Sequence, residues 1–327
     1  MVVLQNLRCL LIVLLLIGAP SSLWAQSEED GTGPDFAEQV PLAASSLMLD
    51  VVQSGDRLVA VGERGHVIFS DDQGQTWRQA ESVPTRSTLT SVYARDDLLW
   101  AGGHDSVLLA SADNGNNWSL QYFDPERQQP VMDLYFADAD NGIAVGAYGL
   151  MLVTSDGGEN WDDWAVNDED EMHLNAITET ADGGLMIAGE AGFSYRSEDV
   201  GETWESLELP YRGSMFGAVA YDSSCVMFFG LRGHAMSSCD DGLTWEEMDT
   251  GTQATLLGGT SSGDGVVIVG NSGLVLEYNP DSGFSASTHS SGVDFSSVVA
   301  VGPGQFLLVG EDGTHFYPES TGEGVQR

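Results

Sequence analysis

The sequence predicts an all-β fold, a seven-bladed β-propeller built of four-stranded antiparallel blades. Three observations lead to this prediction: a short motif recurs at a near-constant period, a glycine-rich turn recurs in phase with it, and the flanks of each turn are β-branched and apolar. Four short strands per unit at a period of about 40 residues are typical of a propeller blade. Long amphipathic helical patterns are absent from the sequence.

The recurring motif reads Ser/Thr-x-Asp-x-Gly-x-x-Trp and occurs five times, with its tryptophans 41 to 43 residues apart. Short Ser and Asp side chains can accept hydrogen bonds from the backbone N–H groups of the turn that they begin. Gly supplies a positive φ angle, and Trp covers apolar surface between sheets. One Asp per blade lies far from the next, so we expect a structural role and not a catalytic or metal-binding set. The motif residues are Ser70, Asp72, Gly74 and Trp77; Ser111, Asp113, Gly115 and Trp118; Thr154, Asp156, Gly158 and Trp161; Ser197, Asp199, Gly201 and Trp204; and Ser238, Asp240, Gly242 and Trp245.

A Gly-x-x-Gly turn begins eight residues before these motifs and extends the count to seven repeats. The turn occupies residues 62–65, 146–149, 189–192, 230–233, 270–273 and 310–313, with a variant at 103–106. The motifs that should follow the last two turns have decayed. Apolar runs flank each turn, as at 58–61 and 66–69, and predict the two central strands of a blade.

The repeats predict a single propeller domain over residues 36–320, with a flexible segment at 26–35 before it and a tail at 321–327 after it. Residues 1–25 have the pattern of a secretory signal peptide, with Arg8 before an apolar stretch. We therefore expect an exported, periplasmic protein; the alternative is an uncleaved membrane anchor.

The last repeat lacks a convincing fourth strand. Residues 37–41 resemble residues 80–84, which follow the first motif tryptophan. We therefore expect residues 36–43 to supply the outer strand of the last blade. This strand would close the ring and protect an open sheet edge.

The charge of the chain argues against two classes of partner. It carries 50 Asp and Glu against 11 basic residues, all of them Arg, for a formal net charge of -39. Such a surface repels phosphate backbones and anionic lipid headgroups. We expect no nucleic acid and no direct binding to an anionic membrane.

Five of the scarce arginines are expected to share one face of the propeller. Loops between the second and third strands of a blade open on the same face as the loops that link blades, whereas the Asp motifs occupy the other face. A local basic patch there could bind carboxylates in a bidentate manner. The alternative is that these arginines neutralise loop acids such as Glu63, Asp124 and Glu126. The candidate partner-binding residues are Arg64, Arg86, Arg127, Arg212 and Arg232, with His66 and His234 from the repeated Arg-Gly-His tripeptide.

The two later cysteines, Cys225 and Cys239, flank the turn at 230–233. Pairing Gly230 with Gly233 places them within one residue of opposite positions, within reach of a disulfide. Export favours oxidation, and two free thiols are the alternative. No Cys/His spacing resembles a metal site, the histidines have no recognisable nucleophile motif beside them, and the acidic run 168–171 lacks the pattern of a calcium loop. The sequence predicts no catalytic residues, no metal and no cofactor.

These motifs together resemble the photosystem II stability/assembly factor family of Asp-box (BNR) repeat propellers, over residues 36–320. The resemblance rests on the five Asp boxes, the Gly-Glu-Arg-Gly turn at 62–65, the signal peptide and the seven repeats. It implies a non-catalytic exported scaffold that holds a membrane-protein assembly intermediate, in photosynthetic members the D1 reaction-centre precursor. It also implies contact through an arginine patch, for which Arg64 and Arg232 match the Gly-x-Arg-Gly turn positions. The expected partner is an integral membrane protein or complex, photosystem-like or a transporter.

Two alternative functions remain open. Sialidases and some endoglucanases also carry Asp boxes, so a glycosidase is one alternative, although the early Arg-Ile-Pro motif of sialidases is absent. A protein that binds a glycan or another small ligand at the mouth of the central channel is the other. Turnover of a fluorogenic sialoside would distinguish the first from a scaffold, and melting shifts across a sugar panel would reveal the second.

Overall fold

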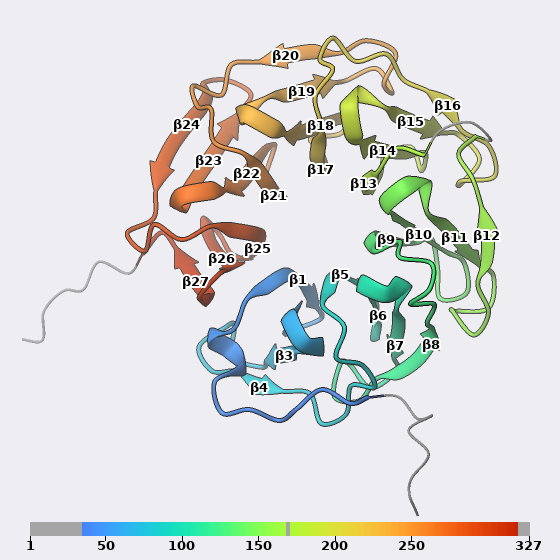
Figure 1. Ribbon diagram of the computed structural model, residues 1–327. Coiled ribbons are helices and arrows are strands. Elements are labelled where there is room, and N and C mark those ends of the chain that lie inside the picture. Colours follow the sequence, from blue (N-terminus) through green and yellow to red (C-terminus); the bar gives the residue numbers. More distant parts are fainter. Residues whose placement is uncertain (1–34, 168–170, 320–327) are drawn as a thin grey trace, which may run out of the picture. The chain divides into compact units, whose positions relative to one another are not determined.

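The computed structural model describes residues 35–167 and 171–319, and these residues contain 27 strands and no α-helix. The strands form seven antiparallel sheets, arranged as a ring around a central channel (Figure 1). Six sheets have four strands, and the seventh has three. The predicted seven-bladed propeller is therefore confirmed. The expected signal peptide at 1–25, most of the segment 26–35 and the tail 321–327 lie outside the described residues.

The strands of each blade follow one another in sequence from the channel outward. Blades 1 to 4 consist of β1 (Met48–Ser54), β2 (Arg57–Gly62), β3 (Val67–Ser70) and β4 (Arg78–Gln79); β5 (Leu89–Arg95), β6 (Leu98–Gly103), β7 (Leu108–Ser111) and β8 (Ser119–Tyr122); β9 (Val131–Phe136), β10 (Gly142–Gly146), β11 (Met151–Thr154) and β12 (Asp162–Trp164); and β13 (Leu174–Glu179), β14 (Leu185–Gly189), β15 (Ser194–Ser197) and β16 (Glu205–Ser206). Blades 5 to 7 consist of β17 (Met215–Tyr221), β18 (Cys225–Gly230), β19 (Ala235–Ser238) and β20 (Glu246–Met248); β21 (Leu256–Ser262), β22 (Gly265–Gly270), β23 (Leu274–Asn279) and β24 (Gly283–Thr288); and β25 (Phe295–Gly302), β26 (Gln305–Gly310) and β27 (Gly313–Tyr317).

The glycine-rich turns join the second and third strands of blades 1 to 6 as single 3-10 turns. The central residue of each adopts a positive φ, which is 56° for Arg64 and 57° for Arg232. The first glycine is required by a close approach, because a Cβ on Gly62 would lie 2.1 Å from the carbonyl oxygen of Leu47. The turns are η2 (Glu63–Gly65), η3 (His104–Ser106), η4 (Ala147–Gly149), η5 (Glu190–Gly192), η6 (Leu231–Gly233) and η7 (Asn271–Gly273).

The apolar core lies between neighbouring sheets and closes the ring. The second strand of each blade is almost wholly buried and packs against the next sheet, as Val59 of blade 1 does against Leu99 and Trp118 of blade 2. Leu307 and Val309 of blade 7 pack in the same way against Met48 and Leu58 of blade 1. Sheet-to-sheet burial is therefore continuous from the last blade to the first, and burial of this kind is the main stabilising contribution to folding.

Residues 36–43, expected to form the outer strand of blade 7, have no strand pairing with β27 among the described residues. The N–H of Ala37 donates to the carbonyl of Val83 at 3.0 Å, and Gln39 Nε2 donates to the carbonyl of Ala80 at 2.7 Å, so this segment runs beside blade 1. The following turn η1 (Ala43–Ser45) contacts β27. Closure of the ring by an N-terminal strand stays a prediction. No helix in the described part of the chain is long and apolar enough to cross a membrane.

Candidate functional site

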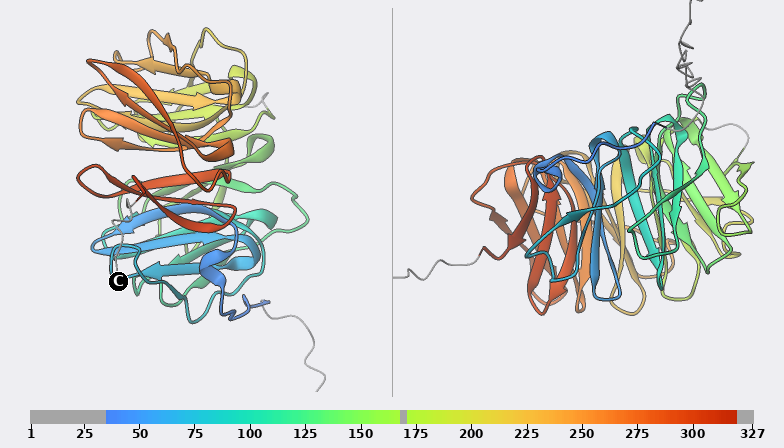
Figure 2. Two further views of the ribbon diagram at one scale, coloured as in Figure 1. Left: turned by 90° about the vertical axis from the view of Figure 1, so that its left-hand side faces the viewer. Right: turned by 90° about the horizontal axis from the view of Figure 1, so that it is seen from below.

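The antiparallel strand order gives the propeller two loop-bearing faces, seen edge-on in Figure 2. Connections from the second to the third strand and connections between blades open on one face, which we call the turn face. Connections from the first to the second strand and from the third to the fourth open on the other, which we call the box face because it carries the Asp boxes. All five candidate arginines lie in turn-face connections. They do not form one cluster, because Arg64 belongs to blade 1 and Arg232 to blade 5.

Three of these arginines are exposed. The side chain of Arg64 is 78% exposed, and its nearest acidic partner is Glu63 at 4.0 Å. Arg212 and Arg232 are also exposed, and neither makes a side-chain hydrogen bond or ion pair to another described residue. Arg64 and Arg232 each occupy the left-handed tip of a turn, a conformation that non-glycine residues adopt rarely. Their guanidinium groups are free to meet a carboxylate from another molecule.

The other two arginines are held by acids of the chain itself. Arg86 pairs with Asp35 at 3.1 Å and with Glu38 at 2.9 Å. Arg127 pairs with Asp163 and also donates to the phenol oxygen of Tyr122 at 3.2 Å. For Arg86 and Arg127, then, the structure fits charge neutralisation within the molecule, although their partners are not the predicted Asp124 and Glu126.

The two candidate histidines differ in their exposure. His66 is only 3% exposed, and burial lowers the pKa of its imidazole. It follows η2 directly and is already inside the packed part of the blade, so it is not part of a binding surface. His234 is part-exposed, stacks on Tyr211 with ring centroids 3.8 Å apart, and hydrogen-bonds Glu247 through Nδ1 at 2.7 Å.

Exposed aromatic side chains on the turn face were missed by sequence reasoning. Tyr148 occupies the same turn position as Arg64 and Arg232, and it is 57% exposed. Phe123, in the connection from blade 2 to blade 3, is 50% exposed, and Phe36 is 48% exposed beside Arg86. Aromatic residues and arginines are enriched in protein-binding surfaces. The shared turn position was the signal that could have identified Tyr148.

The Asp boxes are hydrogen-bonded turns. In the first box, Ser70 Oγ accepts from the N–H of Gly74 at 2.8 Å and donates to Asp72, which accepts from the N–H of Thr76 at 2.8 Å. These bonds favour the ionised carboxylate, so the pKa of Asp72 falls to about 2. The same two bonds recur in the other four boxes. The Ser or Thr hydroxyl accepts from the N–H of the box glycine, and the Asp carboxylate accepts from the N–H four residues after it. Their carboxylates are occupied by their own turns.

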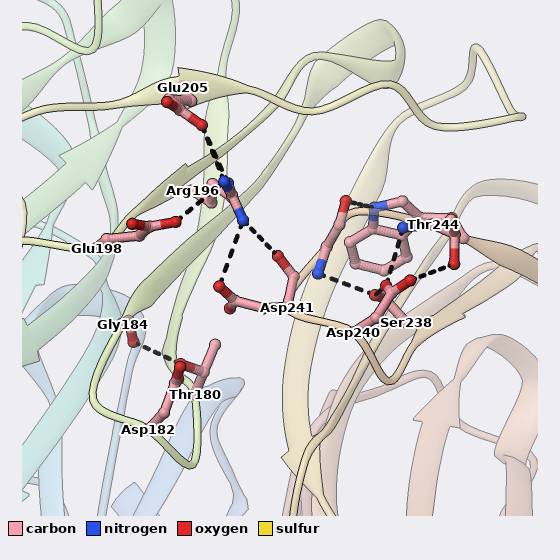
Figure 3. A network of polar contacts seen from close by, with 12 residues as sticks. Thr180, Asp182, Gly184, Arg196, Glu198, Glu205, Ser238, Asp240, Asp241 and Thr244 are labelled. Carbon is pink, nitrogen blue, oxygen red and sulfur yellow. Dashed lines mark hydrogen bonds and ion pairs between the residues drawn. The ribbon is translucent and has the colours of Figure 1, made fainter.

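An ion-pair network beside the fifth Asp box links blades 4 and 5 (Figure 3). Arg196 of β15 pairs with Glu198 at 3.0 Å and Glu205 at 3.1 Å within blade 4, and with Asp241 of blade 5 at 3.3 Å. Its Nη1 also donates to the carbonyl of Asp241 at 3.1 Å. The arginine therefore bridges the two blades on the box face, where a groove of about 320 Å³ remains beside Asp241.

The central channel contains two aspartates that the sequence did not single out. Asp50 of β1 accepts from Ser297 of blade 7 at 2.8 Å and from the N–H of Val92 of blade 2 at 2.9 Å. Asp133 of β9 occupies the equivalent place in blade 3, accepting from Ser91 at 3.1 Å and from the N–H of Ile177 at 2.9 Å. Burial raises the pKa of Asp50 to about 6 and that of Asp133 to about 7. Each carboxyl group ties three blades together at a β-bulge of the innermost strand.

Cys225 and Cys239 form a disulfide between β18 and β19. The 3-10 turn adds one residue to the hairpin register, so the two cysteines lie directly opposite each other. Within residues 35–167 and 171–319, no group of three His, Cys, Asp or Glu side chains could hold a metal ion.

Comparisons with known proteins agree with this architecture. Residues 121–256 match the sequence model of the family described as photosynthesis system II assembly factor YCF48, and residues 35–179 match the DUF6242 beta propeller domain. The photosystem II assembly lipoprotein Ycf48 of Synechococcus sp. (strain CC9902) is 33% identical over 87 residues. This match spans 26% of this chain and 26% of that relative.

Solved propellers resemble the chain over most of its length. A structure of YCF48 bound to a D1 peptide matches with a TM-score of 0.66 at 17% identity, covering 88% of this chain and 95% of that one. YCF48 from Cyanidioschyzon merolae matches with a TM-score of 0.67 at 17% identity, covering 86% and 97%. The WD40 propeller domain of Doa1 gives 0.68 at 13% identity, covering 88% and 97%, so structural likeness at this identity shows the fold alone. Sequence and fold together confirm the predicted resemblance: the chain is a seven-bladed propeller similar to the photosystem II assembly factor Ycf48.

Proposed function

We propose that this chain is an exported, non-catalytic scaffold that binds and stabilises a membrane-protein complex or its assembly intermediate. The observation that carries the proposal is the exposure of Arg64, Arg212 and Arg232 on the turn face of a Ycf48-like propeller. A guanidinium group binds carboxylates with two parallel hydrogen bonds, so such a face suits an acidic or carboxylate-bearing segment. Exposed Phe123 and Tyr148 on the same face add apolar contact area.

The similar structure of YCF48 is a complex with a D1 peptide, which supports a photosystem membrane protein as the client. The resemblance to an assembly lipoprotein supports an exported location. The five Asp-box carboxylates lie in hydrogen-bonded turns, and Asp50 and Asp133 tie blades together, an arrangement that suits a scaffold better than an acid–base pair.

Crosslinking of the tagged protein in its native envelope, followed by mass spectrometry, tests the identity of the partner. We expect one integral membrane complex to be enriched over a tagged unrelated propeller, and in a photosynthetic host we expect D1. Capture of nothing above that control would contradict the proposal. Turnover of a fluorogenic sialoside that is lost in Arg64→Ala or Arg232→Ala would contradict its non-catalytic part.

A further inference from the structure

A groove of about 460 Å³ lies between blades 3 and 4 on the box face. Its floor is apolar and includes Tyr135, Ile143 and Val153. Two large apolar side chains on its rim are exposed, Trp164 at 47% and Val200 at 49%. Val200 also has a φ of 58°, which is a strained conformation for a β-branched residue.

Other blade junctions show which side chains normally reach this position. In three junctions, a side chain of the preceding blade donates to the carbonyl of the fourth residue of the Asp box. Arg57 Nη1 donates to the carbonyl of Asn114 at 2.8 Å, and Arg196 Nη1 donates to that of Asp241 at 3.1 Å. At the junction of blades 2 and 3, Trp100 Nε1 donates to the carbonyl of Gly157 at 2.8 Å.

The equivalent carbonyl at the junction of blades 3 and 4 belongs to Val200, and no donor among residues 35–167 and 171–319 reaches it. The reason is visible in the repeat. Counted from the glycine that ends each second strand, Arg57 corresponds to Asn141 of blade 3, and Trp100 corresponds to Ile143. Arg196 corresponds to Val153, since Arg196 and Val153 each directly precede the first residue of an Asp box.

None of the three residues can supply the bond. Ile143 and Val153 have no donor, and the amide of Asn141 is bound to Asp138 at 3.0 Å. All three line the groove. The junction therefore lacks the donor that Arg57, Trp100 or Arg196 supplies elsewhere. Its groove of about 460 Å³ is also larger than the groove of about 320 Å³ that remains beside Asp241 at the junction bridged by Arg196.

The surroundings of the groove match those of the arginines that bridge other junctions. Arg57 lies over the ring of Phe69 at 4.1 Å and pairs with Asp71, and Arg196 pairs with three carboxylates. The groove offers the ring of Trp164 and the carboxylates of Asp138 and Glu202. Hydrogen bonds from Asn141 lower the pKa of Asp138, so this group is ionised at neutral pH.

The cation nearest to Asp138 does not fill the groove. Arg95 donates to the carbonyl of Phe136 at 2.9 Å and contacts Tyr93, and it does not line the groove. Carboxylates, an open carbonyl and an aromatic face are together the environment that binds a guanidinium group best.

We propose that this groove binds an arginine side chain of a partner polypeptide, which takes the place that Arg57 and Arg196 occupy within the chain. The guanidinium donates to the Val200 carbonyl and pairs with Asp138 and Glu202, while its methylene groups lie on Val153 and against Trp164. The site lies on the face opposite the proposed client surface, and its existence does not depend on that function.

The test uses the peptide acetyl-Gly-Ser-Arg-Ser-Gly-amide and its lysine and citrulline counterparts, titrated into the ¹⁵N-labelled protein. The readout is the indole N–H signal of Trp164, assigned from its loss in Trp164→Phe. We expect a saturable shift with the arginine peptide at about 0.2 M salt, at least tenfold weaker binding of the lysine peptide, and no shift with citrulline. Equal binding of the three peptides, or a response of Trp164 only to neutral oligosaccharides, would overturn the proposal.

Two variants place the site. Val153→Arg supplies the missing arginine in the chain itself and should weaken peptide binding at least tenfold. Ala110→Arg is the matched control, since it is the equivalent position of blade 2, where Trp100 already occupies the Gly157 carbonyl. If Val153→Arg does not fold, Glu202→Gln on the exposed rim should still weaken binding severalfold. Unchanged binding in a folded Val153→Arg, or in Glu202→Gln, would contradict the assignment.

Discussion

Two single residues, Asp50 and Asp133, make the stability of the ring depend on pH. Each has a pKa above the ordinary value of 3.8, so the folded protein binds protons that the unfolded chain releases. Stability from this source is therefore fully present below pH 3.8, and it is lost progressively as the pH rises to about 6 for Asp50 and about 7 for Asp133. Because the channel admits some solvent, we expect Asp133 alone to account for roughly 2 kcal/mol between pH 5 and pH 8.

Denaturant unfolding of the wild type and of Asp133→Asn at several pH values checks this prediction. The amide cannot ionise, so the difference in unfolding free energy between the two proteins should shift in favour of the variant as the pH rises. Burial lowers the pKa of His66 and of the part-exposed His315, and taking the difference removes their contribution. A difference that does not change with pH would show that Asp133 is ionised throughout.

The Asp boxes predict a second effect at the residue scale. Ser111 is buried, and its Oγ accepts from the N–H of Gly115 at 2.9 Å. Ser111→Ala leaves that buried N–H without a partner, so we expect a loss of about 1 to 3 kcal/mol of unfolding free energy. Ser119→Ala removes only an exposed bond to the carbonyl of Ala110 and should cost less than about 0.5 kcal/mol. Equal losses would show that the box bond is not stabilising.

Among the elements, the disulfide-linked hairpin of β18 and β19 allows stability to be changed without changing the proposed binding surface. Cys225 and Cys239 enclose a short loop, for which the chain-entropy account gives about 2 to 3 kcal/mol of stabilisation. Replacing both by Ser should lower the unfolding free energy by that amount. The disulfide joins the box-face end of the hairpin whose turn-face end carries Arg232, so capture of a partner should not change at temperatures where the variant is folded. Loss of capture by a fully folded variant would contradict this.

The elements also show what the sequence could and could not predict. The period of the boxes and turns predicted seven blades, because each repeat must form one sheet that packs on the next. The exact hairpin register was one residue off, since the 3-10 turn at 231–233 adds a residue that the glycine pair did not reveal. The burial of His66 depends on the position at which β3 begins, and the sequence pattern of the turn alone did not predict that position.

Residues brought together only by ring closure were beyond prediction from local sequence. Asp50 and Asp133 alternate with apolar neighbours as exposed strand residues would, and only the ring turns them into the channel. Likewise, the groove beside Val200 is visible only by comparing blade junctions. The turn face was predicted from strand order, whereas the spread of Arg64 and Arg232 over two distant blades came from the structure.

In the whole molecule, the turns proposed to bind a client lie outside the apolar core between the sheets. Stability comes from burial between sheets, so charge changes at exposed turn tips should leave folding intact. We propose that these tips bind a membrane-protein client. This proposal predicts that folding and binding can be separated by substitution.

Arg64→Glu combined with Arg232→Glu tests this claim most directly, with thermal unfolding and crosslinked client measured on the same preparation. Arg78→Glu, an exposed arginine on the box face, is the control for a change of charge. We expect the double variant to melt within about 2 °C of the wild type, as surface substitutions usually do, and to lose most of the captured client, while Arg78→Glu retains it. Undiminished capture by the folded double variant, or its global unfolding, would contradict the account.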